Sequence, residues 1–394
     1  MNIRKITFGN FKSLYNAAFE PGKVNVFIGA NGSGKTTILE AIGLLSAAMT
    51  DRVDSSSLQR KGVRLSIPSL YKSSFKDLKR QRSMIDLSLE WEDDCCTDKF
   101  RYDVHLTTPT DTDYWKYHSE AFLQNGEKIW GRSNASQQQS NSYIGFFLID
   151  NDPELTTGRK IAEDFSSYGI FQPNTLTLRG TIPDPNQVSP VGLNGGRLAE
   201  AIRTLIHEND GDLFFGNLYM DDILDMIDWA SDISVDTPKK TTINANIPTT
   251  RQVIEFTDRY MKDTARFTDY DASEGALYVL FMLTLAMHPM GPSIFSVDSF
   301  DHALNPRLAK KMIQVFCEQI IQNNKHVFLT THNPLVLDGL DLQNDDIRLF
   351  AVDRDSNGYA QIRRISVSQE LIDEGLPLSR LWISGRLGGV PSLL

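Results

Sequence analysis

One glycine-rich run has the residue types and the spacing needed to hold a phosphate group. The segment GANGSGKT occupies residues 29–36, follows the apolar stretch VNVFI and leads into a sequence with helical spacing of apolar residues. Small residues let successive backbone N–H groups surround phosphate oxygens, and a helix start adds partial positive charge beneath them. Lys35 is expected to reach the β- and γ-phosphates and the Thr36 hydroxyl to bind Mg²⁺. The pattern predicts a site for ATP and Mg²⁺ formed by Asn31, Gly32, Ser33, Gly34, Lys35, Thr36 and Thr37.

A second group of residues with chemical potential lies in the last third of the chain. DASEGALYVL (271–280) places Ser273 and Gly275 at the start of an apolar helix. The apolar strand SIFSV ends before Asp298, and after one helix the strand HVFLTT ends before His332. We expect Asp298 to lie near Thr36 and to hold Mg²⁺ through its hydration shell. Taken singly, these residues are also compatible with a capping carboxylate, a helix-capping serine and a turn histidine.

The order of these segments resembles the ABC-type ATPases of the RecF, SMC and OLD group. That group carries a phosphate loop, an S-x-G signature, a Walker B strand, a D-loop and a switch histidine in this order. The opening FGNFKSL (8–14), which contains Lys12, is similar to the strand that passes beside the nucleotide base in the group. The likeness covers residues 1–45 and 250–340, and only loosely the middle. It implies an ABC-type head with a D-loop at residues 302–305.

The same resemblance implies how the site is completed. In proteins of this shape the signature faces away from the chain's own phosphate loop and contacts ATP held by another copy. Ser273 and Gly275 would therefore bind the γ-phosphate of a second protomer, and the protein would form a head-to-tail homodimer or a higher oligomer. His332 would hydrogen-bond the γ-phosphate and report its presence.

One position departs from the pattern of the group. The Walker B strand usually ends in Asp-Glu, and the Glu polarises the attacking water, whereas this chain has Asp298-Ser299. A serine hydroxyl has no useful basicity near neutral pH, so the loss of the carboxylate would remove a factor of roughly 10² to 10⁴ from the rate. Asp301 is the candidate substitute through a water molecule. The sequence therefore predicts firm ATP binding and slow hydrolysis.

The surrounding pattern predicts an α/β fold. Short strands at the start, alternating segments over 84–107 and strand–helix units after 250 indicate an ABC-type head with an antiparallel β lobe. We expect residues 1–110 and 251–394 to form its two halves and 111–250 to be a mostly helical insertion. No heptad pattern is sustained, so no long coiled coil is expected.

Composition limits the surroundings and the partners. The 394 residues carry 40 Lys and Arg against 50 Asp and Glu, a net charge of −10, so a nucleic-acid surface would have to be local. The three cysteines, including the adjacent Cys95 and Cys96, form no disulfide or zinc pattern, which favours a reducing compartment. The longest apolar run is too short for a membrane span, so we expect a cytoplasmic protein with no membrane partner.

Other segments leave alternatives open. Residues 51–82 hold nine Lys or Arg against three Asp, which fits either a DNA or partner surface or a solvated loop. Gln59 and Gln81 are both candidates for the glutamine loop. VDRDSNG (352–358) has a D-x-D pattern like that of TOPRIM nucleases, but a hairpin turn fits better because only about 40 residues follow. The tail, 381–394, either docks a partner or closes the core.

The function expected from these features is an ATPase that dimerises around ATP and controls a separate effector. Short ATPases with a D-x-F-D ending resemble those of bacterial anti-phage systems, which work beside a nuclease or toxin, and this chain has no nuclease, protease or transferase constellation of its own. The alternatives are a RecF-like clamp that binds DNA through residues 51–82, a scaffold that binds ATP without hydrolysing it, and a transporter ATPase, which the long middle disfavours.

Overall fold

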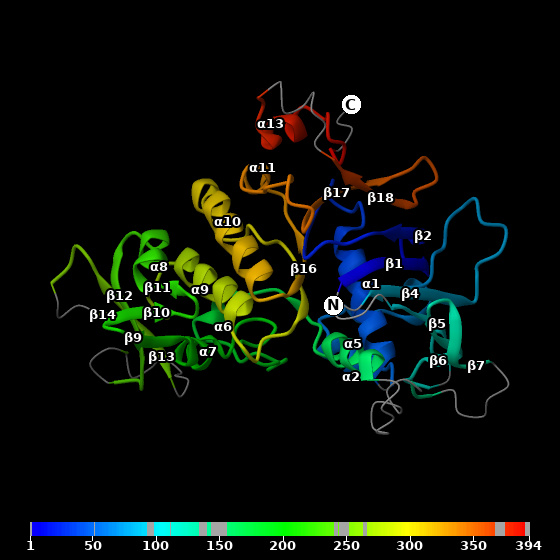
Figure 1. Ribbon diagram of the computed structural model, residues 1–394, viewed down its shortest axis with the longest axis horizontal. Helices are drawn as coiled ribbons and strands as arrows, with labels where there is room; N and C mark the ends of the chain where they lie inside the picture. The colour runs from blue at the N-terminus through cyan, green and yellow to red at the C-terminus, as the bar shows by residue number, and fades with distance from the viewer. Residues whose placement is uncertain are drawn as a thin grey trace.

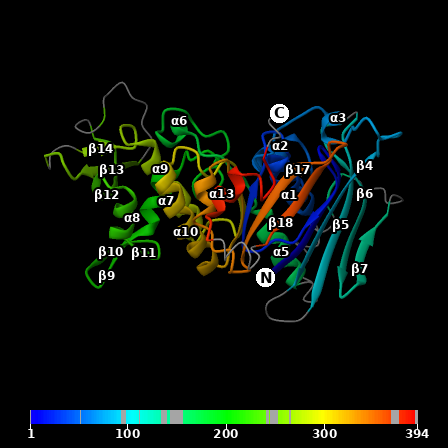
Figure 2. The same cartoon turned by 90° about the horizontal axis from the view of Figure 1, so that it is seen from above.

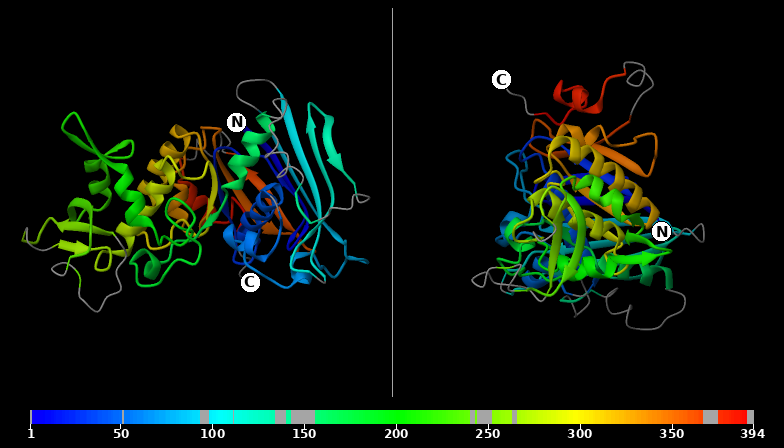
Figure 3. Two further views of the ribbon diagram at one scale, coloured as in Figure 1. Left: turned by 90° about the horizontal axis from the view of Figure 1, so that it is seen from below. Right: turned by 90° about the vertical axis from the view of Figure 1, so that its left-hand side faces the viewer.

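A computed structural model describes most of the chain. The described residues are 2–50, 52–92, 98–110, 112–133, 140–142, 156–239, 243, 252–262, 266–366 and 375–390. Cys95 and Cys96 lie outside them. Figure 1 shows a central α/β body with a lobe at each end, and Figure 3 shows the same two lobes from below.

The central body is built on a six-stranded sheet whose strands, apart from one edge, are parallel. In spatial order the strands are β18 (Ala360–Ile365), β17 (Ile347–Arg354), β3 (Val24–Ile28), β16 (His326–Thr330), β15 (Ile294–Val297) and β8 (Ile170–Phe171). The edge strand β18 pairs antiparallel with β17, which confirms the hairpin expected at residues 352–358. Every residue of β3 is buried, so the phosphate loop leaves the middle of the sheet.

The lobe beside this body is an antiparallel sheet, as the alternating segments predict. In spatial order its strands are β2 (Leu14–Phe19), β1 (Asn2–Phe11), β4 (Met84–Glu92), β5 (Lys99–Thr107), β6 (Lys116–Gln124) and β7 (Glu127–Arg132). Because β6 pairs with β5 and β7 with β6, the lobe continues past residue 110 to residue 132.

The middle of the chain contains more strand than the expected mostly helical insertion, and that expectation has to be corrected. Its described helices are α5 (Thr156–Ser166), α6 (Thr175–Leu178), α7 (Leu198–Leu205) and α8 (Met220–Met226). Two three-stranded antiparallel sheets accompany them: β9 (Ile206–Asn209), β10 (Asp212–Phe215) and β11 (Leu218–Tyr219), and β12 (Ala230–Asp236), β13 (Val253–Asp258) and β14 (Arg266–Thr268). Asp210 and Gly211, at φ 53° and 88°, form the tight turn between β9 and β10. The second sheet crosses residue 250 because β12 pairs with β13.

Helices cover both faces of the central sheet. The described helices of the first and last thirds are α1 (Lys35–Thr50), α2 (Ser55–Arg60), α3 (Pro68–Tyr71), α9 (Glu274–Met287), α10 (Pro306–Gln322), α11 (Pro334–Leu337) and α13 (Leu378–Ile383). Helix α1 lies between the central sheet and the antiparallel lobe (Figure 2). Helices α9 and α10 pack on the opposite face. Since successive residues of a strand face opposite sides, Val26 joins the core with α9 while Phe27 joins the core with α1.

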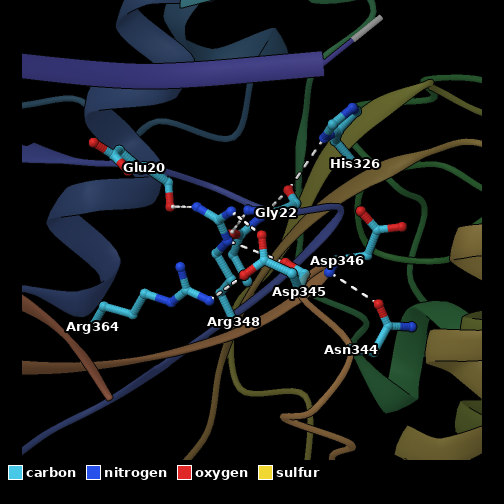
Figure 4. Close-up of polar contacts among 9 residues, drawn as sticks. Glu20, Gly22, His326, Asn344, Asp345, Asp346, Arg348 and Arg364 are labelled. Atoms are coloured by element: carbon cyan, nitrogen blue, oxygen red, sulfur yellow. Dashed lines mark hydrogen bonds and ion pairs between the residues drawn. The ribbon is translucent and has the colours of Figure 1, made fainter. Parts of the chain in front are cut away.

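The ends of the central strands farthest from the phosphate loop are tied together by a polar cluster (Figure 4). Asp345 pairs with Arg348, at the start of β17, and with Arg364 on β18. Arg348 Nη1 also donates to the Glu20 carbonyl at 2.9 Å, which joins the β17–β18 hairpin to the turn before β3. Exposed ion pairs of this kind contribute about 0–1 kcal/mol each, so the cluster mainly fixes strand ends. The candidate site lies at the opposite ends of these strands, beside the phosphate loop.

Candidate nucleotide-binding site

The phosphate loop connects β3 to α1 as its sequence predicts. Gly32 and Gly34 adopt φ values of 75° and 119°, which side chains rarely tolerate, so the loop depends on glycine at both positions. A Cβ atom on Gly34 would also lie 2.9 Å from Ser13 Oγ. Asn31 is exposed at the tip of the loop, and Thr37 lies in the first turn of α1.

Lys35 is buried at the base of this loop. Its Nζ donates to the carbonyl oxygens of Gly29 and Ala30 at 2.7 and 3.0 Å. Burial lowers the pKa of Lys35 to about 8, although the negative charges of Asp298 and Asp301 act in the opposite direction. A phosphate oxygen beside Nζ would favour the charged amine further, because an opposite charge at close range stabilises it.

The two halves of the chain meet where Thr36 faces Asp298. Thr36 Oγ1 lies 3.2 and 3.1 Å from the two carboxylate oxygens of Asp298, and Thr330 Oγ1 donates to Oδ1 at 2.5 Å. Asp298 follows β15 and Thr330 ends β16, the strand between β15 and β3. A hydroxyl and a carboxylate at this spacing are ligands that Mg²⁺ accepts beside water and phosphate oxygens. The residues therefore fit the Mg²⁺ that the resemblance implies.

Unpaired hydroxyl groups in and beside the phosphate loop also indicate a polar ligand. The hydroxyls of Ser33 and Ser13 are buried, and neither has a hydrogen-bond partner among the residues that the structure describes. Buried polar groups are normally paired, so unpaired ones call for an explanation such as a ligand or water.

Three further residues of the predicted site gather at the same edge of the sheet. Ser299 has φ 63°, a costly conformation for a residue with a side chain, and its N–H donates to Thr330 Oγ1 at 2.8 Å. Asp301 Oδ1 accepts from Thr331 Oγ1 at 2.6 Å and from the backbone N–H of His332 at 3.2 Å. Burial and the charge of Lys35 lower the pKa of His332, while Asp301 and Asp298 partly oppose the shift. His332 is therefore neutral at neutral pH.

Lys12 pairs with a residue of α1 that lies about one helical turn beyond the phosphate loop. Its Nζ pairs with Glu40 Oε2 of α1 at 2.6 Å and lies over the rings of Phe11 and Tyr71. The fully buried Glu40 also binds Arg64 Nε at 2.7 Å. The charge of Asp298 is one of the causes that raise the pKa of Arg64, after Glu40 itself, so Arg64 belongs to the electrostatic surroundings of the site. Residue types and spacing did not single it out.

The predicted signature lies in a separate cavity. Ser273 caps α9 and accepts a hydrogen bond from the N–H of Ala276 at 3.3 Å. Trp229 Nε1 donates to the same oxygen, also at 3.3 Å. A Cβ atom on Gly275 would lie 3.2 Å from the carbonyl of Ala303, in the predicted D-loop, which explains why glycine suits this position.

The cavity around Ser273 has a volume of about 580 Å³. Besides Ser273 and Gly275, its lining includes Asn305, Arg307 and Lys311, and none of the phosphate-loop residues 29–37, all of them described. The structure thus places the two predicted halves of an ATP site at different places on one chain.

The basic segment 51–82 is largely committed to contacts within the chain. Described pairs join Arg64 to Glu40, Arg52 to Asp54 and Arg82 to Asp86. Lys61 is buried, with its Nζ donating to the Ser166 carbonyl. Lys76, Lys79 and Arg80 remain exposed.

The glutamine loop is not resolved by these contacts. Gln81 donates to the Ser73 carbonyl at 3.1 Å, and Gln59 is exposed on α2. Neither observation links a glutamine to the pair formed by Thr36 and Asp298.

Comparisons with known proteins agree with this geometry. Residues 1–150 match the family described as "AAA ATPase domain", and residues 183–338 match "AAA domain, putative AbiEii toxin, Type IV TA system". Among solved structures, an SMC head bound to the C-terminal winged-helix domain of ScpA superposes with a TM-score of 0.55 over 94% of this chain and 100% of that one, at 13% identity. An SMC head with an extended coiled coil, bound to a ScpA domain derived from Pyrococcus furiosus, gives 0.51 over 95% and 98%, at 12% identity.

These findings define the class of fold: the chain is similar to ABC-type ATPases with a RecF/SMC-like head, and each of the two AAA family models matches part of it. Its sequence relatives are named "DNA replication and repair protein RecF". The protein of Phocaeicola vulgatus is 36% identical over 76 residues, 18% of this chain and 20% of the relative. The protein of Renibacterium salmoninarum is 44% identical over 55 residues, 14% of each. The chain thus spans a fifth or less of these curated relatives. Among its described helices, none combines the length and the apolar character needed to cross a bilayer.

Proposed function

We propose that this protein binds Mg·ATP at the phosphate loop, dimerises around it, hydrolyses it slowly and thereby controls a separate effector. The observation that carries the proposal is the contact of Thr36 with Asp298. It brings together, at 3.1 Å, a hydroxyl and a carboxylate that are 262 residues apart in the chain. The pair lies at the start of α1, where the helix N-terminus favours a phosphate group.

Each residue of the site has a role in holding ATP. The N–H groups of residues 32–37 surround the phosphates, and the Lys35 amine leaves the carbonyls of Gly29 and Ala30 to bind phosphate oxygens. Thr36 and Asp298 would hold Mg²⁺, which would neutralise charge on the phosphate oxygens. His332, neutral and carried by the loop after β16, donates a hydrogen bond from its ring N–H to the γ-phosphate.

Hydrolysis is expected to be slow because the strand that ends at Asp298 is followed by a serine. Asp301 is the nearest acidic replacement, and one of its oxygens is already engaged by Thr331 and by the N–H of His332. Only Oδ2 is left to orient a water, so Asp301 would act as a weak general base.

The separation of the signature from the phosphate loop supports dimerisation. Ser273 is exposed, and its oxygen already accepts two hydrogen bonds, from Ala276 and from Trp229. A hydroxyl has two acceptor positions and one donor, so its proton remains to be donated to an anion. A phosphate on a second copy fits that donor, and the SMC heads of similar fold support a pairing of this kind.

Control of a separate effector is proposed from the resemblance to anti-phage ATPases that work beside a nuclease or toxin. One match, over residues 183–338, is to a family whose description names a putative toxin of a toxin–antitoxin system, which supports a setting of this kind. We place the toxic or nucleolytic step in another protein, in an antiviral setting and in the cytoplasm.

A RecF-like DNA-binding function is the second candidate. The local similarity to RecF proteins and the exposed side chains of Lys76, Lys79 and Arg80 favour it. Salt-dependent binding of duplex DNA that requires ATP, and that is lost when Lys76 and Lys79 are both replaced by Glu, would support this candidate.

Two measurements on the purified full-length chain test the main proposal. Equilibrium binding of ATP with and without Mg²⁺ should show binding that Lys35→Ala abolishes. Phosphate release under single-turnover conditions should be slow but above the buffer rate. Release indistinguishable from buffer would leave an ATP-binding scaffold instead, and absence of ATP binding would reject the proposal as a whole.

A further inference from the structure

The phosphate loop is held from outside by a strand that no sequence motif connects to it. Strand β17 runs parallel to β3, with Ala351 beside Ile28, so its last residues lie next to the start of the loop. Arg354, the final residue of β17, donates from Nε to the carbonyl of Gly32 at 2.8 Å. The two residues are 322 positions apart in sequence.

This hydrogen bond fixes one peptide of the loop. In a trans peptide the C=O and the following N–H point in opposite directions. Since Arg354 holds the Gly32 carbonyl on the outside, the N–H of Ser33 is directed into the loop, where it donates to the Ala30 carbonyl at 3.2 Å. Gly32, with φ 75° and no atom within 4 Å of a Cβ position, would otherwise be free to turn.

The residue before Arg354 on β17 holds a second segment that supports the phosphate loop. Asp353 accepts the N–H of Gly389 on both carboxylate oxygens, at 2.9 and 3.1 Å. Arg363 on β18 donates to the carbonyl of Leu387 at 2.7 Å, and the Leu387 side chain is buried in the core. Residues 385–390, here named the strap, are thereby fastened to the β17–β18 hairpin.

The strap lies directly against the first residue of the loop. A Cβ atom on Gly389 would lie 3.2 Å from Gly29 Cα and 3.4 Å from Gly29 N, so the two backbones are in contact. The carbonyl of Gly29 is one of the two that Lys35 holds. When Lys35 turns to a phosphate, the strap remains as the support that keeps this peptide in place.

We propose that Arg354 and the strap held by Asp353 are positioning elements of the phosphate loop, so that nucleotide affinity depends on the docking of residues 385–390. The inference rests on the proposed nucleotide binding and adds a means of regulating it. Coupling between two sites is reciprocal, so bound ATP strengthens strap docking by the factor by which the strap strengthens ATP binding. A partner that draws the strap away would release nucleotide.

Matched glycine variants provide the first test. Gly389→Ala places a methyl group against Gly29 at φ 70°, whereas Gly385→Ala has nearly the same backbone conformation, φ 78°, with no atom within 4 Å of its Cβ. Both variants carry a similar conformational cost, but only Gly389→Ala disturbs the loop. We expect the Kd for Mg·ATP to rise about tenfold in Gly389→Ala and less than about twofold in Gly385→Ala.

A second pair isolates the arginine. Arg354→Ala should raise the Kd about fivefold, the size expected for one lost hydrogen bond, and Arg354→Lys should restore part of the affinity. The loss should persist at roughly 0.5 M KCl, where a long-range charge effect is screened. Arg364→Ala removes the same charge from the opposite end of the hairpin, in the cluster of Figure 4, and should leave the Kd unchanged.

Hydrogen–deuterium exchange on the wild-type chain completes the experiment without a variant. ATP should slow exchange at the Gly389 amide. Wild-type affinity in both Gly389→Ala and Arg354→Ala, or unchanged exchange at residues 385–390 on saturation with ATP, would overturn the inference. Wild-type protein that binds no ATP would instead reject the proposed function on which the inference rests.

Discussion

Replacement of Ser299 by Glu should convert a slow ATPase into a faster one. Ser299 follows Asp298, the carboxylate proposed to hold Mg²⁺, at the position where the ATPases that the chain resembles carry the water-polarising Glu. Its backbone N–H is bonded to Thr330 Oγ1, and this bond does not depend on the side chain. Ser299 already has φ 63° with a Cβ atom present, so a longer side chain adds little backbone strain. The variant should therefore fold and place a carboxylate beside the expected water.

The expected increase in the hydrolysis rate depends on the hydrogen bonds that Asp301 already makes. A positioned general base contributes about 10²–10⁴ to a rate, equivalent to roughly 3–5 kcal/mol of barrier. In the proposed mechanism Asp301 supplies part of this in the wild type through Oδ2, because Thr331 and the N–H of His332 engage Oδ1. We therefore expect Ser299→Glu to raise the single-turnover rate by about 10²-fold, at the lower end of that range.

The assay is phosphate release after mixing excess protein with Mg·ATP, with ATP affinity measured separately. Ser299→Gln provides the matched control, because it has the same size without basicity and should stay at the wild-type rate. Asp301→Asn should lower the wild-type rate about tenfold and have little effect in the Ser299→Glu background. A Ser299→Glu rate within about threefold of wild type, with ATP affinity intact, would refute the assigned roles of both residues.

Two other perturbations test the signature region. Burial raises the pKa of Asp269 to about 7, so the folded state holds a proton that the unfolded chain releases near its ordinary value of 3.8. This stability is present below about pH 4 and is lost as pH rises towards 7, by up to roughly 4 kcal/mol; urea unfolding of Asp269→Asn should lack that part of the pH dependence. Trp229→Phe keeps the packing on neighbouring rings but removes the donor to Ser273, and should weaken ATP-driven dimerisation about fivefold per site. Trp382→Phe is the control, since its indole N–H is buried without a described partner, and equal behaviour of the two variants would exclude the role given to Trp229.

The sequence predicted those parts of the site whose residues belong to short local motifs. The run from Gly29 to Thr36 specifies its own turn, because glycine is required at φ 75° and 119° and the helix follows at once. Asp298 and His332 each end an apolar segment, and parallel strands bring their carboxyl ends to one edge of the sheet. The contact between Thr36 and Asp298 follows from these two local facts.

The residues that sequence reasoning missed act through contacts that no local pattern encodes. Arg354 reaches Gly32 from a strand 322 positions away, and its own surroundings, VDRDSNG, indicate only a turn. Trp229 reaches Ser273 from the middle of the chain, in a stretch that carries no recognised motif. Arg64 lies in a basic segment whose composition also fits a solvated loop. Pairing of this kind depends on the register between distant elements, which composition and periodicity leave open.

The middle of the chain shows the same limit for secondary structure. Short strands such as β9 and β10 have four residues each, too few for alternation to be distinguished from one turn of an amphipathic helix. The one local hairpin signal for these two strands is the Asp210-Gly211 pair. Strands of this length are fixed by their partners in the sheet rather than by their own sequence.

The most direct test of the whole account is the mass of the full-length protein in solution, measured by sedimentation velocity with and without saturating Mg·ATP. The account predicts a monomer that becomes a dimer with ATP, and a Ser273→Arg variant that still binds ATP but stays monomeric. Wild-type protein that remains monomeric with its phosphate loop saturated would contradict it.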